Sequence, residues 1–169
     1  DAPLVGTVGH LVPWKRQEVF LRAAAEIAMH VSRCRFLVVG ADMFGEHREY
    51  VHKLRSLTDT LNIADRTLFT GYRDDAASVM ASLDVLVHTA EHEPLGRAVL
   101  EAMSLGLPCV AADSCGPAEL VQDGVSGLLV TPGDVDGFAR EVINLLRTPA
   151  TARRLGEAAK ARVQERFSA

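Results

Sequence analysis

The sequence lacks an excess of basic residues and any long apolar run. Its 18 Lys and Arg stand against 22 Asp and Glu, for a formal net charge of −4. Because no face is basic enough to track phosphates, we expect no nucleic-acid partner. No apolar run approaches the roughly 20 residues that a membrane-spanning helix needs. The composition, with 48% hydrophobic residues, is that of an ordinary globular domain.

Cysteine is also scarce. Cys34, Cys109 and Cys115 are odd in number and have no regular spacing, which indicates free thiols in a reducing compartment. Cys109 falls in an apolar run and is expected to be a small buried residue. The sequence shows no signal peptide and begins at Asp1 rather than Met, so we expect a cytoplasmic fragment of a longer protein.

Several ligand-binding motifs are missing as well. The first glycine pair, Gly6-Thr-Val-Gly9, is not G-x-G-x-x-G, and the second strand ends at Gly40 with no acidic residue, so a nicotinamide enzyme is not expected. The P-loop pattern is absent. No Asp-x-Asp pair lies in a predicted loop, and we expect no zinc site around the histidines and no metal site elsewhere.

What the sequence does contain is a regular alternation of strands and helices. The strands are continuous apolar runs, as expected when both faces of a sheet are covered. We expect a single domain over residues 1–169, with a Rossmann-like, doubly wound α/β sheet of about six parallel strands and helices on both faces. The expected strands are 4–8, 35–39, 67–70, 84–88, 108–112 and 127–130. The expected helices are 14–30, 47–62, 76–82, a central one from about Pro94, and 116–122, 134–147 and 150–167. Asp74 or Asp75 is expected to cap the helix over 76–82.

In such a sheet, ligands bind along the carboxyl edge of the strands. The loops expected there begin at Gly9, Gly40, Gly71, Thr89 and Asp113. A glycine at a strand end followed by Lys15 at a helix start would suit an anion such as a phosphate. A solvated lysine at a helix end explains the same residues without a ligand.

The stretch after residues 84–88 places two carboxylates near one another. Glu93 follows the strand, Pro94 suits the first turn of a helix, and Gly96 permits a close approach to the helix start. Glu101 then lies one to two turns into that helix. Both carboxylates can also be explained without a ligand. Glu101 would pair with Arg97 on the surface of the helix, and Glu93 would be a loop acid near the positive end of a helix.

The same stretch resembles a known family. Glu93-Pro-Leu-Gly-Arg-Ala-Val-Leu-Glu101, two glutamates with seven residues between them, is similar to the signature of the retaining family 4 glycosyltransferases, which have the GT-B fold. The similarity continues, in the same order, through 102–113, 116–119 and 123–130, and covers essentially the whole chain. It matches only the C-terminal, nucleotide-sugar-binding half of such enzymes.

The resemblance implies roles for individual residues. Glu93 aligns with the acid that grips hydroxyls of the transferred sugar, and Glu101 with the acid that accepts hydrogen bonds from the ribose hydroxyls. Lys15 matches a lysine that holds the donor diphosphate, beside Gly9. Thr89 falls where a small hydroxyl residue faces the phosphates. The N–H groups of Leu95 and Gly96, after Pro94, are expected to face the diphosphate at a helix start.

At three further positions the sequence departs from the signature or leaves alternatives open. His10 occupies the place of an arginine that holds the diphosphate, and a histidine cannot make a bidentate phosphate clamp. His10 as a plain turn residue remains an alternative. The resemblance places the nucleotide base at Gly71, with Tyr72 or Arg73 able to stack on it. Glu119 matches a recurrent glutamate that serves either the loop or the ligand.

The resemblance implies an enzyme that moves a sugar from a nucleoside diphosphate of the UDP or GDP type to an acceptor hydroxyl, in polysaccharide or glycolipid synthesis. It implies no cofactor and no metal. The acceptor site would come from an N-terminal domain that is absent here, as would any contact with a membrane. The isolated domain is therefore expected to be inactive. The alternatives are a degenerate nucleotide-sugar-binding module and another GT-B enzyme, such as a sugar-nucleotide epimerase.

Overall fold

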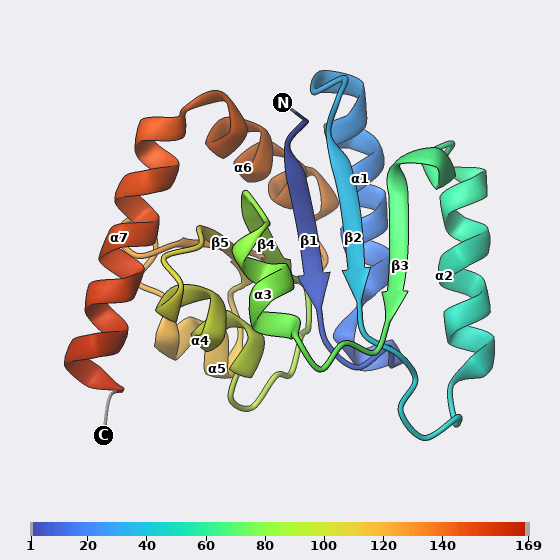
Figure 1. Cartoon of the computed structure of the whole chain (residues 1–169), viewed down its shortest axis with the longest axis horizontal. Helices are drawn as coiled ribbons and strands as arrows, with labels where there is room; N and C mark the ends of the chain where they lie inside the picture. Colours follow the sequence, from blue (N-terminus) through green and yellow to red (C-terminus); the bar gives the residue numbers. More distant parts are fainter. Residues whose placement is uncertain (1, 168–169) are drawn as a thin grey trace.

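The protein is built on one six-stranded sheet in which all neighbouring strands are parallel (Figure 1). The computed structural model describes residues 2–167. The strand order is β3-β2-β1-β4-β5-β6. The strands are β1 (Leu4–Val8), β2 (Arg35–Val39), β3 (Thr67–Gly71), β4 (Val85–His88), β5 (Cys109–Ala112) and β6 (Leu128–Val130). The predicted doubly wound α/β class is confirmed.

Helices cover both faces of the sheet, which explains why the strands are apolar runs (Figure 1). On one face, Phe20, Phe36 and Phe138 belong to a buried cluster beneath α1, α2 and α6. On the other face, Met80 and Met103 belong to a second cluster beneath α3 and α4. Helix α7 packs against α4 on this side. The helices are α1 (Gln17–His30), α2 (Arg48–Thr60), α3 (Ala76–Ala81), α4 (Arg97–Ser104), α5 (Cys115–Leu120), α6 (Val135–Arg147) and α7 (Pro149–Arg166).

The strand order reverses at β1. From β1 the chain first builds outward through β2 to β3, and then returns to the other side of β1 with β4. The crossover segments on the two sides therefore diverge at the carboxyl ends of β1 and β4. A crevice is expected at this point in an open parallel sheet. Among the described helices, none is both long and apolar enough to cross a membrane.

Helix α1 begins later than its sequence pattern predicts. Pro13–Lys15 forms a 3-10 turn, and Arg16 has φ 57, in the left-handed region, so the α-helix begins at Gln17 instead of Trp14. A left-handed residue cannot continue a right-handed helix, and apolar periodicity does not report it. The turn nevertheless keeps Lys15 at the carboxyl edge of β1.

Helix α4 also begins later than predicted, at Arg97, with Gly96 as its N-cap at φ 73. Pro94 therefore lies in the loop before the helix, not in its first turn. Asp75 is the N-cap residue of α3, as predicted, but its side chain makes no capping hydrogen bond, so that part of the prediction is wrong. Its carboxylate accepts two hydrogen bonds from Arg73 instead, each 2.7 Å long. The bidentate charged pair is the stronger interaction.

Candidate functional site

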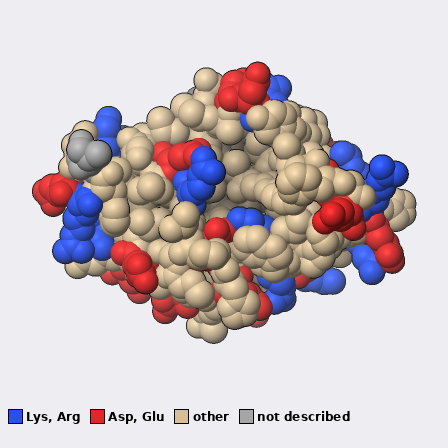
Figure 2. Space-filling model, turned by 90° about the horizontal axis from the view of Figure 1, so that it is seen from below, with Lys and Arg blue, Asp and Glu red and all other residues tan. Residues whose placement is uncertain are grey.

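A cavity of about 380 Å³ opens at the carboxyl edge of the sheet, where the strand order reverses. Figure 2 shows this side of the molecule hollowed near its centre, with acidic and basic side chains around the hollow. The segments after β1, β2 and β3 and one side of α3 and α4 form its walls. The predicted site residues that line it are Gly9, His10, Lys15, Tyr72, Arg73 and Glu101. Gly71 lines a neighbouring cavity that shares Gly40 and Ala41 with this one.

Lys15 and Glu93 meet beside this cavity. The Lys15 ammonium donates a hydrogen bond to Glu93 Oε2 and lies 4.5 Å from the centre of the Trp14 ring. Glu93 is buried, with 7% of its surface exposed. His88, at the end of β4, places its Nε2 3.5 Å from the same carboxylate oxygen. The two residues that the resemblance implies for the diphosphate and the sugar are thus paired with each other.

This arrangement keeps Glu93 ionised. The interaction with His88 and the hydrogen bond and charge of Lys15 outweigh burial and lower the pKa of Glu93 from its ordinary value of 4.5 to about 2. The carboxylate therefore stays a pure hydrogen-bond acceptor over the whole physiological pH range. Such a group suits the binding of sugar hydroxyls.

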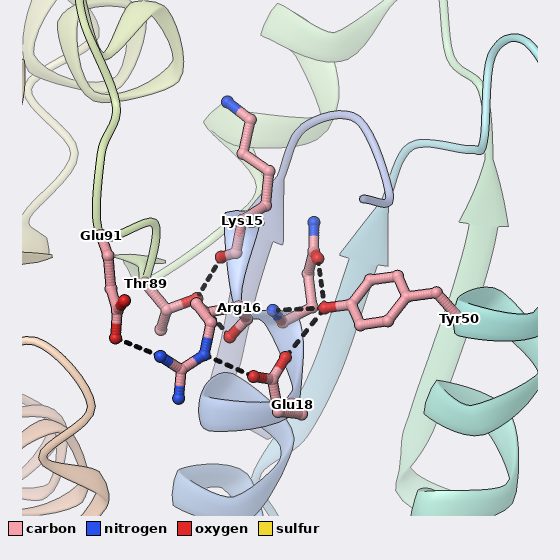
Figure 3. A network of polar contacts seen from close by, with 7 residues as sticks. Lys15, Arg16, Glu18, Tyr50, Thr89 and Glu91 are labelled. Atoms are coloured by element: carbon pink, nitrogen blue, oxygen red, sulfur yellow. Dashed lines mark hydrogen bonds and ion pairs between the residues drawn. The ribbon is translucent and has the colours of Figure 1, made fainter. Parts of the chain in front are cut away.

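A second network holds the backbone of Lys15 and Arg16 in place (Figure 3). The Thr89 hydroxyl lies 2.9 Å from the Lys15 carbonyl and 2.8 Å from the Arg16 carbonyl, to which it donates. The Arg16 guanidinium bridges Glu18, 2.5 Å away, and Glu91. Figure 3 shows the Lys15 side chain pointing away from this network. The loop after β4 thus fixes the position of the loop after β1, so that the Lys15 ammonium points toward the cavity.

The network extends to α2. The Tyr50 hydroxyl lies 2.8 Å from Gln17 Oε1 and 2.9 Å from Glu18 Oε2, and it accepts a hydrogen bond from the Gln17 N–H at 3.0 Å. Burial and the Glu18 carboxylate raise the pKa of the Tyr50 phenol, so it remains a proton donor. The start of α1 is therefore held from two sides.

Thr89 does not face the open cavity as the resemblance implied. Only 1% of its surface is exposed, and its hydroxyl is committed to the two carbonyls. The isosteric change Thr89→Val is expected to lower the free energy of unfolding by about 1–2 kcal/mol, because it removes the hydroxyl that bonds the part-buried Lys15 and Arg16 carbonyls and leaves the Arg16 carbonyl with the Val19 N–H alone. Urea titration measures this. Ser104→Ala removes an exposed hydroxyl bonded to the Leu100 carbonyl and is the control. Equal effects of the two changes would contradict the assignment.

His10 serves the loop after β2 in this structure. Its Nε2 accepts a hydrogen bond from the Met43 N–H at 3.0 Å and lies 3.8 Å from Asp42 Oδ1. The ring packs edge-on against Phe44, with 5.7 Å between ring centres. Because Nε2 is an acceptor here, only Nδ1 carries a proton when the ring is neutral. The ring still lines the cavity.

Of the remaining predicted residues, some line the cavity and others lie outside its lining. Tyr72 is 64% exposed at the cavity mouth. Leu95 is 70% exposed and, like Pro94, does not line the cavity. Gly96 does permit a close approach, but by α5: a Cβ there would lie 3.2 Å from Pro117 and 3.3 Å from Leu120. Arg97 and Ala98, the first residues of α4, line the cavity instead.

Two of the predicted glutamates differ in their surroundings. Glu101 lines the cavity, and among the described residues it forms no ion pair with Arg97. The alternative of a surface pair is therefore not what the structure shows. Glu119 is exposed on α5, away from the cavity lining, and its carbonyl accepts a hydrogen bond from Arg162 at 3.2 Å.

Three residues of the site were not predicted from the sequence: His88, Arg16 and Glu91. His88 ends an apolar strand at the carboxyl edge, a signal that could have marked it. No local pattern distinguishes Arg16 or Glu91. Within residues 2–167, no group of three or more His, Cys, Asp or Glu side chains comes together as metal ligands would. The three cysteines are free, and Cys109 is buried as predicted.

Comparison with known proteins identifies relatives over nearly the whole chain. A family model described as glycosyl transferases group 1 matches residues 1–162. The lipopolysaccharide core biosynthesis glycosyltransferase LpsE of Rhizobium meliloti is 36% identical over 157 residues, which are 93% of this chain and 43% of LpsE. The N-acetyl-alpha-D-glucosaminyl L-malate synthase of Bacillus anthracis is 35% identical over 153 residues, which are 90% of this chain and 38% of that enzyme. The chain spans less than half the length of these relatives.

Solved structures agree with this assignment. HepE of Anabaena, in complex with UDP-glucose, has a TM-score of 0.94 and 33% identity, covering 99% of this chain and 45% of HepE. The C-terminal domain of LpcC from Francisella tularensis has a TM-score of 0.89 over 98% of this chain and 86% of that domain; at 18% identity it shows the fold alone. By sequence and by structure, the chain belongs to the glycosyl transferases group 1 family.

Proposed function

We propose that this chain is the donor-binding, C-terminal half of a family 4-like retaining glycosyltransferase, and that the whole enzyme transfers a sugar from a nucleoside diphosphate to an acceptor hydroxyl. The observation that carries the proposal is the cavity at the reversal of strand order, which is lined by Gly9 and Lys15 from the segment after β1 and by Glu101 from α4. The donor proposed first is UDP-glucose, because HepE, 33% identical, was solved in complex with it.

The charges suit the two ends of such a donor. Lys15, at the cavity wall, would meet the diphosphate, and the first turn of α4 adds the positive end of a helix dipole. Glu101 would accept hydrogen bonds from the two ribose hydroxyls. Glu93, ionised behind Lys15, would hold the sugar and not attack it. No covalent intermediate is proposed: the acceptor attacks from the side that the diphosphate leaves, assisted by that diphosphate.

The base would lie toward the loop after β3. Tyr72 is exposed there and free to lie against a flat ring. Arg73 lines the same wall, but its bidentate pair with Asp75 fixes its position. Arg73 could therefore stack on the base without moving only if the base lay directly over that pair. Tyr72 is therefore the stacking residue that we favour.

The acceptor site lies outside this chain in our proposal. The chain covers 43% and 38% of the two relatives, which leaves room for a second domain in a full-length protein. That domain would face the open cavity, bring the acceptor, and make any contact with the cytoplasmic membrane. Polysaccharide or glycolipid synthesis in the cytoplasm, without a metal ion, is the setting that we propose.

Calorimetric titration of this chain with UDP-glucose tests the donor site. We expect saturable binding that does not change when magnesium is removed. Glu101→Ala should weaken binding by about tenfold or more, because hydrogen bonds to a charged group contribute about 1.5–3 kcal/mol. Glu157→Ala, an exposed glutamate on α7, is the matched control and should bind as the wild type does. If UDP-glucose, GDP-mannose and ADP-glucose all fail to bind, the proposed function is wrong for this chain.

A further inference from the structure

His88 is a buried ring with an unused nitrogen. It ends β4, only 4% of its surface is exposed, and its Nε2 has no hydrogen-bond partner. Glu93 Oε2 lies 3.5 Å from this nitrogen, and the same oxygen accepts the hydrogen bond of the Lys15 ammonium. A buried polar atom without a partner is unfavourable and rare in folded proteins, so this one requires an explanation. The proposed roles of Lys15 and Glu93 leave this nitrogen unexplained.

The electrostatic surroundings of His88 are simple. Among residues 2–167, Glu93 provides the one carboxylate within 4 Å of the ring nitrogens. The flanking strands β1 and β5 contribute a single titratable side chain, Cys109, whose pKa burial raises to about 12. The helices packed on β4 carry charged residues that are exposed or paired at the surface: Arg97 and Glu101 on α4, and Asp136, Arg140, Glu141 and Arg147 on α6. Lys15 and Glu93 therefore set the field at His88.

Donor binding would disturb the Lys15–Glu93 pair, if the chain acts as proposed above. A nucleoside-diphosphate sugar brings two negative charges to the cavity that Lys15 lines. An ammonium that turns toward the diphosphate leaves the buried Glu93 carboxylate with a weaker counter-charge. A buried carboxylate without a positive partner is strongly unfavourable, so a replacement charge is favoured. Histidine is the side chain that most readily gains a proton near neutral pH.

We propose that His88 takes up a proton when the donor binds and replaces Lys15 as the positive partner of Glu93. In the ligand-free state, Lys15 neutralises Glu93 and His88 is neutral. In the donor complex, Lys15 serves the diphosphate, and protonated His88 donates from Nε2 to Glu93. The carboxylate then keeps its ionised form and its orientation toward the sugar. His88 is thus a positioning residue for Glu93, and this inference rests on the proposed donor site.

Calorimetry in buffers of different ionisation enthalpy counts the protons. UDP-glucose is the probe, because both phosphates are esterified and neither titrates between pH 6 and 8, unlike the terminal phosphate of UDP. For this chain at pH 7 we expect uptake of between about half a proton and one proton per UDP-glucose bound. By linkage, affinity should then fall as pH rises from 6 to 8, by up to about tenfold per pH unit.

Two variants identify the group that takes the proton. His88→Asn, which keeps a polar side chain but cannot titrate, should bind more weakly and without proton uptake. His10→Asn removes the histidine that lines the cavity, whereas His88 lies buried behind it, and this change should leave the uptake unchanged. Binding without proton uptake in the wild type overturns the inference while the donor site stands. Loss of uptake in His10→Asn, and not in His88→Asn, also overturns it. No binding of any sugar nucleotide overturns the proposed function itself.

Discussion

Glu93→Gln is expected to lower the free energy of unfolding at pH 7 by about 2–3 kcal/mol. The change keeps the shape of the side chain but removes the charge that Lys15 and His88 face. Glu93 is 7% exposed, so solvent screens this charge weakly. The Lys15 ammonium keeps its contact with Trp14 but loses its hydrogen-bonded partner. Breaking a buried pair from one side is costly because the remaining charge stays behind.

The same change should alter the dependence of stability on pH. The pKa of Glu93 is about 2 in the folded protein against an ordinary value of 4.5. A carboxyl whose pKa is lowered by folding stabilises the protein above its unfolded pKa. This stabilisation is fully present above about pH 5 and is lost as the pH falls from 4.5 toward 2. The difference between the two values corresponds to a contribution on the order of 3 kcal/mol.

Urea unfolding of both proteins between pH 3 and pH 7 measures this effect. The difference in unfolding free energy between wild type and Glu93→Gln should be largest at pH 7 and shrink steadily below pH 4.5. Glu101→Gln, whose carboxylate has no ion-pair partner among the described residues, serves as the control and should change stability by less than about 0.5 kcal/mol. A difference that is independent of pH would show that Glu93 does not contribute through its charge.

Gly40→Ala is expected to destabilise the protein by about 3 kcal/mol or more and to abolish binding at the cavity. Gly40 follows β2 with φ +132, and a Cβ there would lie 1.9 Å from the Gly9 carbonyl oxygen. Both partners in this clash are backbone, so neither can move away by a side-chain rotation. Gly40 also donates to the Gly71 carbonyl at 3.0 Å, which ties the loops after β2 and β3 together. Any shift that relieves the clash therefore deforms the cavity walls.

A second glycine is a control for the backbone conformation, because it has a left-handed φ but no steric clash. Gly124 has φ +76, and a Cβ there would meet nothing within 4 Å. Gly124→Ala should therefore lower the free energy of unfolding only by the cost of an alanine in the left-handed conformation, about 1–2 kcal/mol. It should leave UDP-glucose binding intact. Thermal or urea unfolding and calorimetry of both variants provide the comparison. Similar losses in the two variants would mean that the clash at Gly9 is relieved by a small, inexpensive movement.

The local pattern of the sequence was sufficient to predict the sheet and the edge that carries the site. Apolar runs of four or five residues, separated by helical periodicity, identify six parallel strands because a strand covered on both faces must be apolar throughout. Glycines at strand ends mark the turns into the crossovers. The same pattern put Lys15 and Glu101 on segments that follow strands at this edge, but it left a surface role open for each of them. The family signature then added roles that no local pattern contains.

Only the tertiary structure decided how the site residues are paired. Lys15 and Glu93 are 78 positions apart, and Thr89 is 74 and 73 positions from the two carbonyls that its hydroxyl contacts. The left-handed Arg16 moved the start of α1, and its clamp on Glu91 spans 75 positions. Local propensity depends on neighbours within a turn or two, whereas these contacts exist because β1 and β4 lie side by side in the sheet. That adjacency brings Lys15, His88 and Glu93 together, and it determines which charge each of them meets.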